Sequence, residues 1–262
     1  MQLPEAMGVG AKQPMIQIIG LRGLPLVKKS DDLAAQIVKA TKEEGIRLAN
    51  HDVIVIAQKI ISKAEGRVVD LKTITPSPKA ETIAKTSGKD PRHVEAILRE
   101  TAKIVRMKAA HLIVQTRHGF VCANAGVDRS NVEAQDSVVM LPTDPDRSAR
   151  EIRQKIKDLT GTDVGVIVSD TFGRAWRIGQ VNVAIGVDGL RPIIDYRGSK
   201  DMFGYVLNVT QMAVADELAS AAELVMKKSE GIPVVIIKGA DYARGRGSAK
   251  DLIRPEEEDL FR

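Results

Sequence analysis

The chain has 262 residues, of which 44% are hydrophobic and 28% charged, so it can bury a substantial core and its composition excludes disordered and fibrous proteins. Its formal net charge of +5 is small and spread along the chain, and aromatic residues make up 3%. Nucleic-acid binding is therefore disfavoured, because few aromatic side chains are available to stack on bases, whereas small anionic ligands suit the charge.

Cysteine and histidine usage points away from disulfide and zinc chemistry. The single cysteine, Cys122, has no partner for an internal disulfide, and the apolar run around it favours a structural thiol over a nucleophile. The four histidines lack the spacing of a zinc site. Residues 1–30 show no basic start followed by an apolar core, and no apolar run approaches the length of a membrane span. We therefore expect a cytoplasmic protein without a membrane partner.

The N-terminal part predicts a loose leader, two strands and a helix. Residues 1–14 show little periodicity, residues 15–19 form a candidate strand, and the acidic pair at 31–32 begins an amphipathic helix. A buried strand is expected at residues 53–57. The glycine- and proline-rich loop of residues 20–27 has two interpretations: it brings backbone amides close to a ligand, or it is a plain connector.

A basic segment follows the second strand. If Gln58 to Arg67 is helical, Lys59 and Lys63 share one face, where like charges are unfavourable unless an anion lies between them. The segment therefore predicts either a phosphate site or a solvated basic loop.

The middle of the chain predicts helices and a hairpin. Residues 72–90 are typical of a loop with a short helix, and a longer helix is expected from residue 91 to about 107. Residues 112–115 and 120–123 are expected to pair around His118. This histidine is either a base or a solvated or hydrogen-bonded turn residue.

Two acidic stretches follow apolar runs. Asp128 and Asn131 lie three residues apart, and Asp170 with Thr171 ends the apolar run of residues 164–169. Such oxygen ligands suit a hard cation such as Mg²⁺ or Mn²⁺. Asn and Asp are also the residues that build turns, so each stretch alone is open to a metal-site or a structural interpretation.

The second half of the chain opens on a candidate subdomain junction. Two prolines and two aspartates interrupt every periodicity in residues 141–147. Ser148 is the expected cap of the next helix, which Gly161 stops. A half-exposed strand is expected at residues 181–187.

The C-terminal part predicts one long helix and one strand. The longest helix of the chain is expected from residue 208 or 210 to about 228, followed by a strand at residues 234–238. Residues 239–247 form a glycine-rich basic loop, and Ser248 caps a short acidic helix.

Neither a Walker A motif nor a G-x-G-x-x-G fingerprint occurs, so we expect no P-loop. Six segments in order nevertheless resemble the coenzyme F420:L-glutamate ligases, the gamma-glutamyl ligases of deazaflavin coenzyme synthesis. The segments are GLPLV (Gly23–Val27), QKIISKAEGR (Gln58–Arg67), RHGFVCANAGVDRSNV (Arg117–Val132), SDTFGRAWR (Ser169–Arg177), VADELASAAELVM (Val214–Met226) and EGIPVV (Glu230–Val235). The resemblance runs from about Ile16 to the C-terminus.

The resemblance implies a GTP-dependent ligase that adds L-glutamate to the lactyl carboxylate of F420-0 through an acyl phosphate, releasing GDP and phosphate, and then adds further gamma-linked glutamates. It implies an unusual α+β gamma-glutamyl ligase fold over residues 15–262, with two subdomains, mixed or antiparallel sheets and flanking helices. Mg²⁺ or Mn²⁺, with K⁺, are the implied metal ions, and a homodimer is the implied assembly.

Carried over residue by residue, the resemblance also implies site residues. The metal ligands are Asp128, Asp170 and Thr171, with Glu230 as a candidate in a loop that lacks the family's usual glycine after Met226. The nucleotide-binding residues are Leu24, Pro25, Leu26, Val27, Gln58, Lys59, Lys63, Asn131, Ser229, Glu230 and Gly231. Apart from the resemblance, the charge of the residues makes Lys63 and Arg174 the catalytic candidates, and Arg174, Arg177 and Lys200 the candidates for holding the substrate's phosphodiester and carboxylates.

Two other functions are compatible with the same residues. A metal-dependent hydrolase of GTP or of phosphate esters would use the same charges without glutamate. A nucleotide-binding subunit without catalytic activity, derived from a longer bifunctional protein, would keep the nucleotide site alone.

Overall fold

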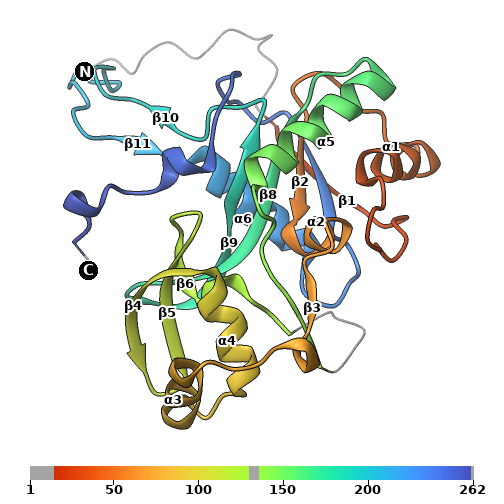
Figure 1. Cartoon of the computed structure of the whole chain (residues 1–262). Helices are drawn as coiled ribbons and strands as arrows, with labels where there is room; N and C mark the ends of the chain where they lie inside the picture. Colours follow the sequence, from red (N-terminus) through yellow and green to blue (C-terminus); the bar gives the residue numbers. More distant parts are fainter. Residues whose placement is uncertain (1–14, 130–135, 261–262) are drawn as a thin grey trace, which may run out of the picture.

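The computed structural model describes residues 15–129 and 136–260. Within them, a five-stranded sheet and three smaller sheets combine with flanking helices (Figure 1), which confirms the predicted α+β fold. None of the helices in these two ranges has the length and apolar character that crossing a membrane requires.

The five-stranded sheet forms the centre of the molecule. Its strands are β1 (Gln17–Leu21), β12 (Val234–Lys238), β2 (Val53–Ala57), β8 (Gly165–Arg174) and β9 (Arg177–Asp188), in that order across the sheet. Only β2 and β8 run parallel, and the other neighbours are antiparallel, so the sheet is mixed. The apolar runs in β2 and β12 are buried along almost their whole length, as expected for inner strands.

Helices cover both faces of this sheet. The helices are α1 (Leu33–Glu43), α2 (Gln58–Ala64), α5 (Pro145–Thr160) and α6 (Val214–Met226). A β-carbon at Gly20 would meet Val225 of α6, and one at Gly186 would meet the backbone of Pro145 in α5. These two glycines occupy alternate positions in the sheet register, so α5 and α6 lie on opposite faces, and glycine permits the close approach of each.

A second, smaller group of elements packs below the central sheet in Figure 1. An antiparallel sheet of β4 (Thr101–Lys108), β5 (His111–Thr116) and β6 (Val121–Ala123) lies with α3 (Pro78–Ser87) and α4 (Pro91–Glu100). β3 (Val68–Asp70) and β7 (Ser137–Val139) form a two-stranded sheet beside it. These elements have a hydrophobic cluster of their own, distinct from that of the central sheet. The subdomain junction near 141–147 stays a prediction.

The helix expected from residue 91 to about 107 is shorter than predicted. It ends at Glu100, and Thr101 begins β4 with extended backbone angles. The apolar residues up to Leu98 follow helical spacing, but pairing with β5 determines the conformation after Thr101. Tertiary pairing thus overrides a periodicity that local sequence continued.

Two further helices, α5 and α6, also differ from the prediction. The α5 helix begins at Pro145, capped by Asp144, which accepts from the backbone N–H of Arg147, while the Ser148 hydroxyl donates instead to the carboxylate of Glu65. The α6 helix spans 13 residues and is shorter than the 16-residue α5, so it is not the longest. Before α6, β10 (Ile194–Asp195) and β11 (Gln211–Met212) form a small antiparallel pair.

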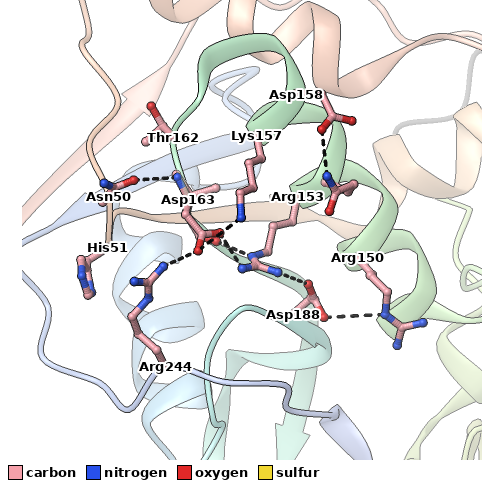
Figure 2. A network of polar contacts seen from close by, with 12 residues as sticks. Asn50, His51, Arg150, Arg153, Lys157, Asp158, Thr162, Asp163, Asp188 and Arg244 are labelled. Carbon is pink, nitrogen blue, oxygen red and sulfur yellow. Dashed lines mark hydrogen bonds and ion pairs between the residues drawn. The ribbon is translucent and has the colours of Figure 1, made fainter.

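Ion pairs tie the sheet together at the start of β8 and the end of β9 (Figure 2). Asp163 accepts from Arg153 and from Arg244, and Asp188 accepts from Arg153 at 3.0 Å and lies 3.7 Å from Arg150. The helix α5, the strand β9 and the C-terminal segment therefore meet at one edge of the sheet. The opposite edge remains for the groups described next.

Candidate functional site

Four segments gather at the end of β2 and the adjoining part of β8. The two strands are parallel and pair Ala57, the last residue of β2, with Ser169, so Gln58 and Asp170 come next along each chain segment. The antiparallel β1 ends and β12 begins at the same edge, and the Ala57 N–H donates to the Pro233 carbonyl at 2.8 Å. The fold therefore brings together α2, Asp170, the loop after β1 and the loop before β12, which are far apart in sequence.

Asp170 is the most perturbed acid at this edge. Burial raises the pKa of its carboxyl to about 6; the Thr171 N–H and the Lys59 charge lower it, the Asp128 charge raises it further, and the Gln58 amide lowers it. These influences show that Asp170 lies close to Asp128, Lys59 and Gln58, as the resemblance implies. Asp170 lies within β8, opposite Val183, and the strand continues to Arg174 rather than ending at Asp170.

Lys59 and Asp128 form a direct ion pair. The Lys59 Nζ lies 2.7 Å from the Asp128 Oδ2. Asp128 is fixed by two backbone hydrogen bonds with Val139, and the turn before it holds Asn124 and Ala125 at φ +54°. Such left-handed angles are uncommon for residues other than glycine and often occur at functional sites. The turn predicted from the sequence thus delivers Asp128 to Lys59 and Asp170.

Buried polar atoms without a hydrogen-bond partner occur close in sequence to Asp128 and Asp170. In the described part of the chain they include the Asn124 Oδ1 and Ser169 Oγ atoms. The Gln58 Oε1 accepts from Ser62 at 2.8 Å, and a hydrogen bond from the Gln58 side chain helps to lower the pKa of Asp170. Since buried polar groups are normally paired, these unpaired protein atoms are candidates for hydrogen bonds to a polar ligand.

The two carboxylates fit one hard cation. The Asp128 charge disfavours the ionisation of Asp170, and a divalent ion between oxygen ligands removes that repulsion. Among residues 15–129 and 136–260, no group of three or more His, Cys, Asp or Glu residues is arranged to hold a metal. Further ligands for a metal at this pair would therefore be water, a phosphate or uncharged oxygens of the chain.

Thr171 lies in a different environment from its neighbour Asp170. Successive side chains of a strand point to opposite faces. The Thr171 hydroxyl donates to the Asn182 Oδ1 at 2.7 Å and accepts from the Lys228 Nζ at 2.8 Å. The structure thus places an ammonium group, contributed by a residue that the sequence did not single out, on the hydroxyl predicted to bind a metal.

The loop after α6 has an unusual backbone. Lys227, at the position where the family's usual glycine is missing, adopts φ +50° and ψ −162°. Ser229, Glu230 and Gly231 follow in an exposed turn, with Gly231 at φ +68°. The turn lies before Pro233 and so near the start of α2. Nucleotide contacts by these three residues, and a metal contact by Glu230, stay predictions.

The loop after β1 packs against neighbouring elements. The backbone N–H groups of Arg22 and Gly23 donate to the Glu44 Oε1 at 2.8 and 2.6 Å, so these amides already have a partner. The Ser30 N–H donates to the carbonyl of Ala64, the last residue of α2, at 2.8 Å. Of the predicted nucleotide-binding residues here, Val27 is buried, Leu24 half-buried, and Pro25 and Leu26 exposed.

The basic segment is helical over Gln58–Ala64, which includes both of its lysines in question. Lys59 and Lys63 are one helical turn apart and both half-buried. Asn131, the remaining predicted nucleotide contact, lies outside the described residues.

The predicted substrate-binding cations lie farther along the chain from Asp170. Arg174 and Arg177 face each other where β8 meets β9, and the Arg174 Nη2 donates to the Ile178 carbonyl at 2.6 Å. Four residues of extended strand separate Arg174 from Asp170, roughly 13 Å. Lys200 lies in an exposed hairpin, bridged to Val206. The structure therefore does not bring Lys200 into contact with the carboxylate cluster.

A cavity of about 280 Å³ lies against β8 and β9. It is lined by Gly119, Phe120, Val121, Phe172, Val183, Ala184, Asp216, Ala249, Leu252, Ile253, Arg254 and Asp259. Phe172 is two residues after Asp170 in β8, so the two side chains share one face of the strand. The sequence did not reveal this cavity, because its walls come from several distant regions without a common motif.

Two residues that are candidates for chemistry by type have structural contacts instead. The His118 Nε2 lies 2.9 Å from the Pro142 carbonyl and 3.2 Å from that of Thr143, so a hydrogen bond holds the ring, which matches one of the two interpretations of its turn. Cys122 is buried, and burial, aided by the Asp170 charge, raises the pKa of its thiol to about 12. This confirms the structural role predicted for the cysteine.

Comparison with known proteins agrees with the resemblance carried by the six sequence segments. The sequence model of the family described as F420-0:Gamma-glutamyl ligase matches residues 22–239. The chain is 50% identical over 250 residues to the coenzyme F420:L-glutamate ligase of Methanothermobacter thermautotrophicus, covering 94% of this chain and 99% of the relative. It is 48% identical to the proteins of that name from Methanocaldococcus jannaschii, over 94% of this chain and 97% of the relative, and Methanopyrus kandleri, over 90% and 93%.

Proposed function

Because the chain belongs to the F420-0:gamma-glutamyl ligase family and is an enzyme of the ligase class, we propose that it joins L-glutamate to the lactyl carboxylate of F420-0 at the expense of GTP. The observation that supports this reaction most directly is the cluster of Asp170, Asp128 and Lys59, which come from segments far apart in sequence. Further gamma-linked glutamates would be added by the same reaction.

The chemistry explains why such a cluster is needed. A carboxylate is a poor electrophile at neutral pH, so the γ-phosphoryl group of GTP is first transferred to the lactyl carboxylate, releasing GDP. The glutamate amine then attacks the acyl phosphate, forms the amide bond and expels phosphate. Phosphoryl transfer depends on positioning and on neutralising charge more than on a protein nucleophile, which matches a site of lysines and carboxylates.

The residues of the cluster divide these tasks. Asp128 and Asp170 would hold Mg²⁺ or Mn²⁺, which neutralises phosphate charge when bound. Lys59 and Lys63, on one face of α2, would bind the phosphate oxygens, with Lys63 as a catalytic residue. The nucleotide would contact residues 24–27, Gln58, Asn131 and residues 229–231. K⁺ would serve as an additional ion.

The acceptor would occupy the cavity beside Phe172. This cavity shares one face of β8 with Asp170, so a ring held there extends its side chain toward the carboxylate cluster. Phe120 and Phe172, 6.3 Å apart between ring centroids, offer apolar faces to an aromatic ring system. Arg174, Arg177 and Lys200 are the proposed contacts for the phosphodiester and carboxylates, with Arg174 also a catalytic candidate.

A homodimer is the proposed assembly. The hairpin between β10 and β11 exposes several large apolar side chains: Met202, Phe203, Tyr205, Val206 and Val209 are 40 to 85% exposed. Clustered exposed apolar side chains are typical of surfaces that contact another chain.

Mass spectrometry of F420-0 incubated with the protein, GTP, L-glutamate and Mn²⁺ tests the proposed reaction. A mass gain of one or more glutamyl units that depends on every component supports it and shows the tail length. Consumption of GTP without a mass gain would favour the hydrolase, and nucleotide binding without consumption would favour the binding subunit.

A further inference from the structure

We infer that the ammonium group of Lys228 occupies a position beside Thr171 where oxygen ligands would otherwise bind a metal cation. The chain therefore binds one metal ion fewer than it would without this lysine. The inference deepens the proposed function, since it concerns the metal requirement of the same site. It starts from the disagreement between the predicted role of Thr171 and the contacts of its hydroxyl.

Three oxygens of different residues surround the Lys228 Nζ. The Thr171 Oγ1 lies at 2.8 Å, the Asn182 Oδ1 at 3.4 Å and the Glu223 Oε1 at 3.4 Å. A hydroxyl, an amide carbonyl and a carboxylate are ligands that hard cations take in proteins. An ammonium group carries three donors and no acceptor, so it matches a set made only of oxygen acceptors.

The Thr171 hydroxyl keeps one lone pair, but a cation bound there would lie close to the Lys228 ammonium. Its proton is directed to Asn182, 2.7 Å away, and it accepts from Lys228. A divalent ion on the same oxygen would lie roughly 2.0 to 2.6 Å from it, within a few ångströms of the ammonium. Because two cations so close together repel each other, the ammonium group and a metal ion do not occupy this place at the same time.

The chain geometry holds Lys228 at this position. The residue before it, Lys227, has backbone angles of φ +50° and ψ −162° at the end of α6. Asn182 is buried in β9 and lies opposite Thr171 in the register, so two of the three oxygens belong to the central sheet. The Lys228 side chain is 61% exposed, so replacing it leaves the buried core unchanged.

The position of this charge connects it with the carboxylate pair. Thr171 directly follows Asp170, and adjacent Cα atoms are about 3.8 Å apart. The Lys228 charge therefore lies one residue along β8 from the proposed metal, on the opposite face of the strand from the Asp170 side chain. It supplies charge neutralisation on the Thr171 side without a second ion.

Counting bound Mn²⁺ tests the inference. The wild-type protein, Lys228→Gln and Lys228→Ala are titrated with Mn²⁺, and free Mn²⁺ is measured by electron paramagnetic resonance. Gln places a carbonyl oxygen where the ammonium lay, and Ala leaves room for water ligands. Each variant is expected to bind one more Mn²⁺ per chain than the wild type. Lys227→Gln, which removes an exposed neighbouring charge outside the three-oxygen set, is the matched control and is expected to leave the stoichiometry unchanged.

The difference between variant and wild type decides the outcome. Equal Mn²⁺ stoichiometry in the wild type and both Lys228 variants would overturn the inference, as would the same gain in Lys227→Gln. Circular dichroism of each variant checks that it is folded. A wild type that binds no Mn²⁺, while the Lys228 variants bind one, would refute the metal proposed at Asp128 and Asp170 and still support the role of Lys228. Glutamate addition, measured by mass spectrometry, tests the proposed reaction separately.

Discussion

At the scale of single residues, Asp170 shows how function opposes stability. Burial raises the pKa of its carboxyl from 3.8 to about 6, so the folded chain holds this proton more tightly than the unfolded chain does. Between pH 3.8 and 6 the folded state therefore binds more protons, and its stability from this group falls as pH rises. Above pH 6 the carboxylate is charged in both states, and the full destabilisation remains.

Replacement of Asp170 by Asn separates these effects. Asp170→Asn is expected to abolish glutamate addition and to unfold at higher urea concentration at pH 7, with a gain of roughly 1 to 3 kcal/mol. The gain should shrink toward zero as the pH falls below 4. Loss of stability at pH 7, or full activity in a folded variant, would contradict the role given to this carboxylate.

Metal binding should follow the same titration. Because Mn²⁺ binds the ionised carboxylate, its affinity is expected to rise with pH up to about 6 and to level off above it. Isothermal titration calorimetry between pH 5 and 8 checks this. An affinity that does not change between pH 5 and 6 would place the metal away from Asp170.

Lys227 is the second residue whose local conformation makes a prediction. Its backbone angles are ones that glycine adopts without strain. Lys227→Gly is expected to raise the free energy of unfolding by about 1 kcal/mol, whereas Lys227→Ala leaves it nearly unchanged because the strain of a β-carbon remains. Urea denaturation of both variants measures the difference, and equal stability of the Gly and Ala variants would show that the turn is unstrained.

At the scale of elements, the face of β8 that carries Asp170 and Phe172 links the cluster to the cavity. Phe172→Ala is expected to raise the KM for F420-0 about tenfold or more while the KM for GTP changes little, because only the acceptor would contact the ring. Leu159→Ala, on the exposed side of α5, is the control. A parallel rise of both KM values would show that the ring supports the whole site.

Elements also show where the sequence was a sufficient guide. The strand of residues 53–57 has its predicted limits, because a continuous apolar run between polar residues has few alternatives. Gly161, at φ +71°, ends α5 as predicted, and Ser248 caps the 3-10 turn Ala249–Leu252. β4 was missed because its residues also fit a helical period, and only the partner strand β5 distinguishes the two.

The site was predictable where one motif carries it and not where several segments meet. Asp128 and Asp170, which the structure brings close together, were candidates because each follows an apolar run with oxygen-rich neighbours. Lys228 was missed because a lysine at the end of a helix is ordinary until the fold places it on Thr171. The cavity beside Phe172 has no local signal, since its walls depend on how the C-terminal segment packs.

At the scale of the whole molecule, the two edges of the central sheet have different roles. One edge carries the ion pairs of Figure 2, where α5, β9 and the C-terminal segment are joined through Asp163 and Asp188. The other carries the loops of the proposed active site. Loops that bind ligands are commonly supported in this way by a rigid scaffold.

The exposed hairpin predicts the assembly of the molecule. Phe203→Asp, in the segment between β10 and β11, is expected to convert a dimer into a monomer by placing a charge in an apolar interface. Light scattering coupled to size-exclusion chromatography measures the mass. Leu260→Asp, at another exposed apolar position, is the control, and an unchanged mass of Phe203→Asp would place the interface elsewhere.

The ion pair between Lys59 and Asp128 has a consequence for the order in which ligands arrive. In the protein without ligands, the Lys59 ammonium and the Asp128 carboxylate form an ion pair with 2.7 Å between Nζ and Oδ2. A phosphate that draws Lys59 away removes one competitor of a metal for Asp128, and a metal on Asp128 removes one competitor of a phosphate for Lys59. Under the proposed function the two ligands are therefore thermodynamically coupled, and each should strengthen the binding of the other by the same factor.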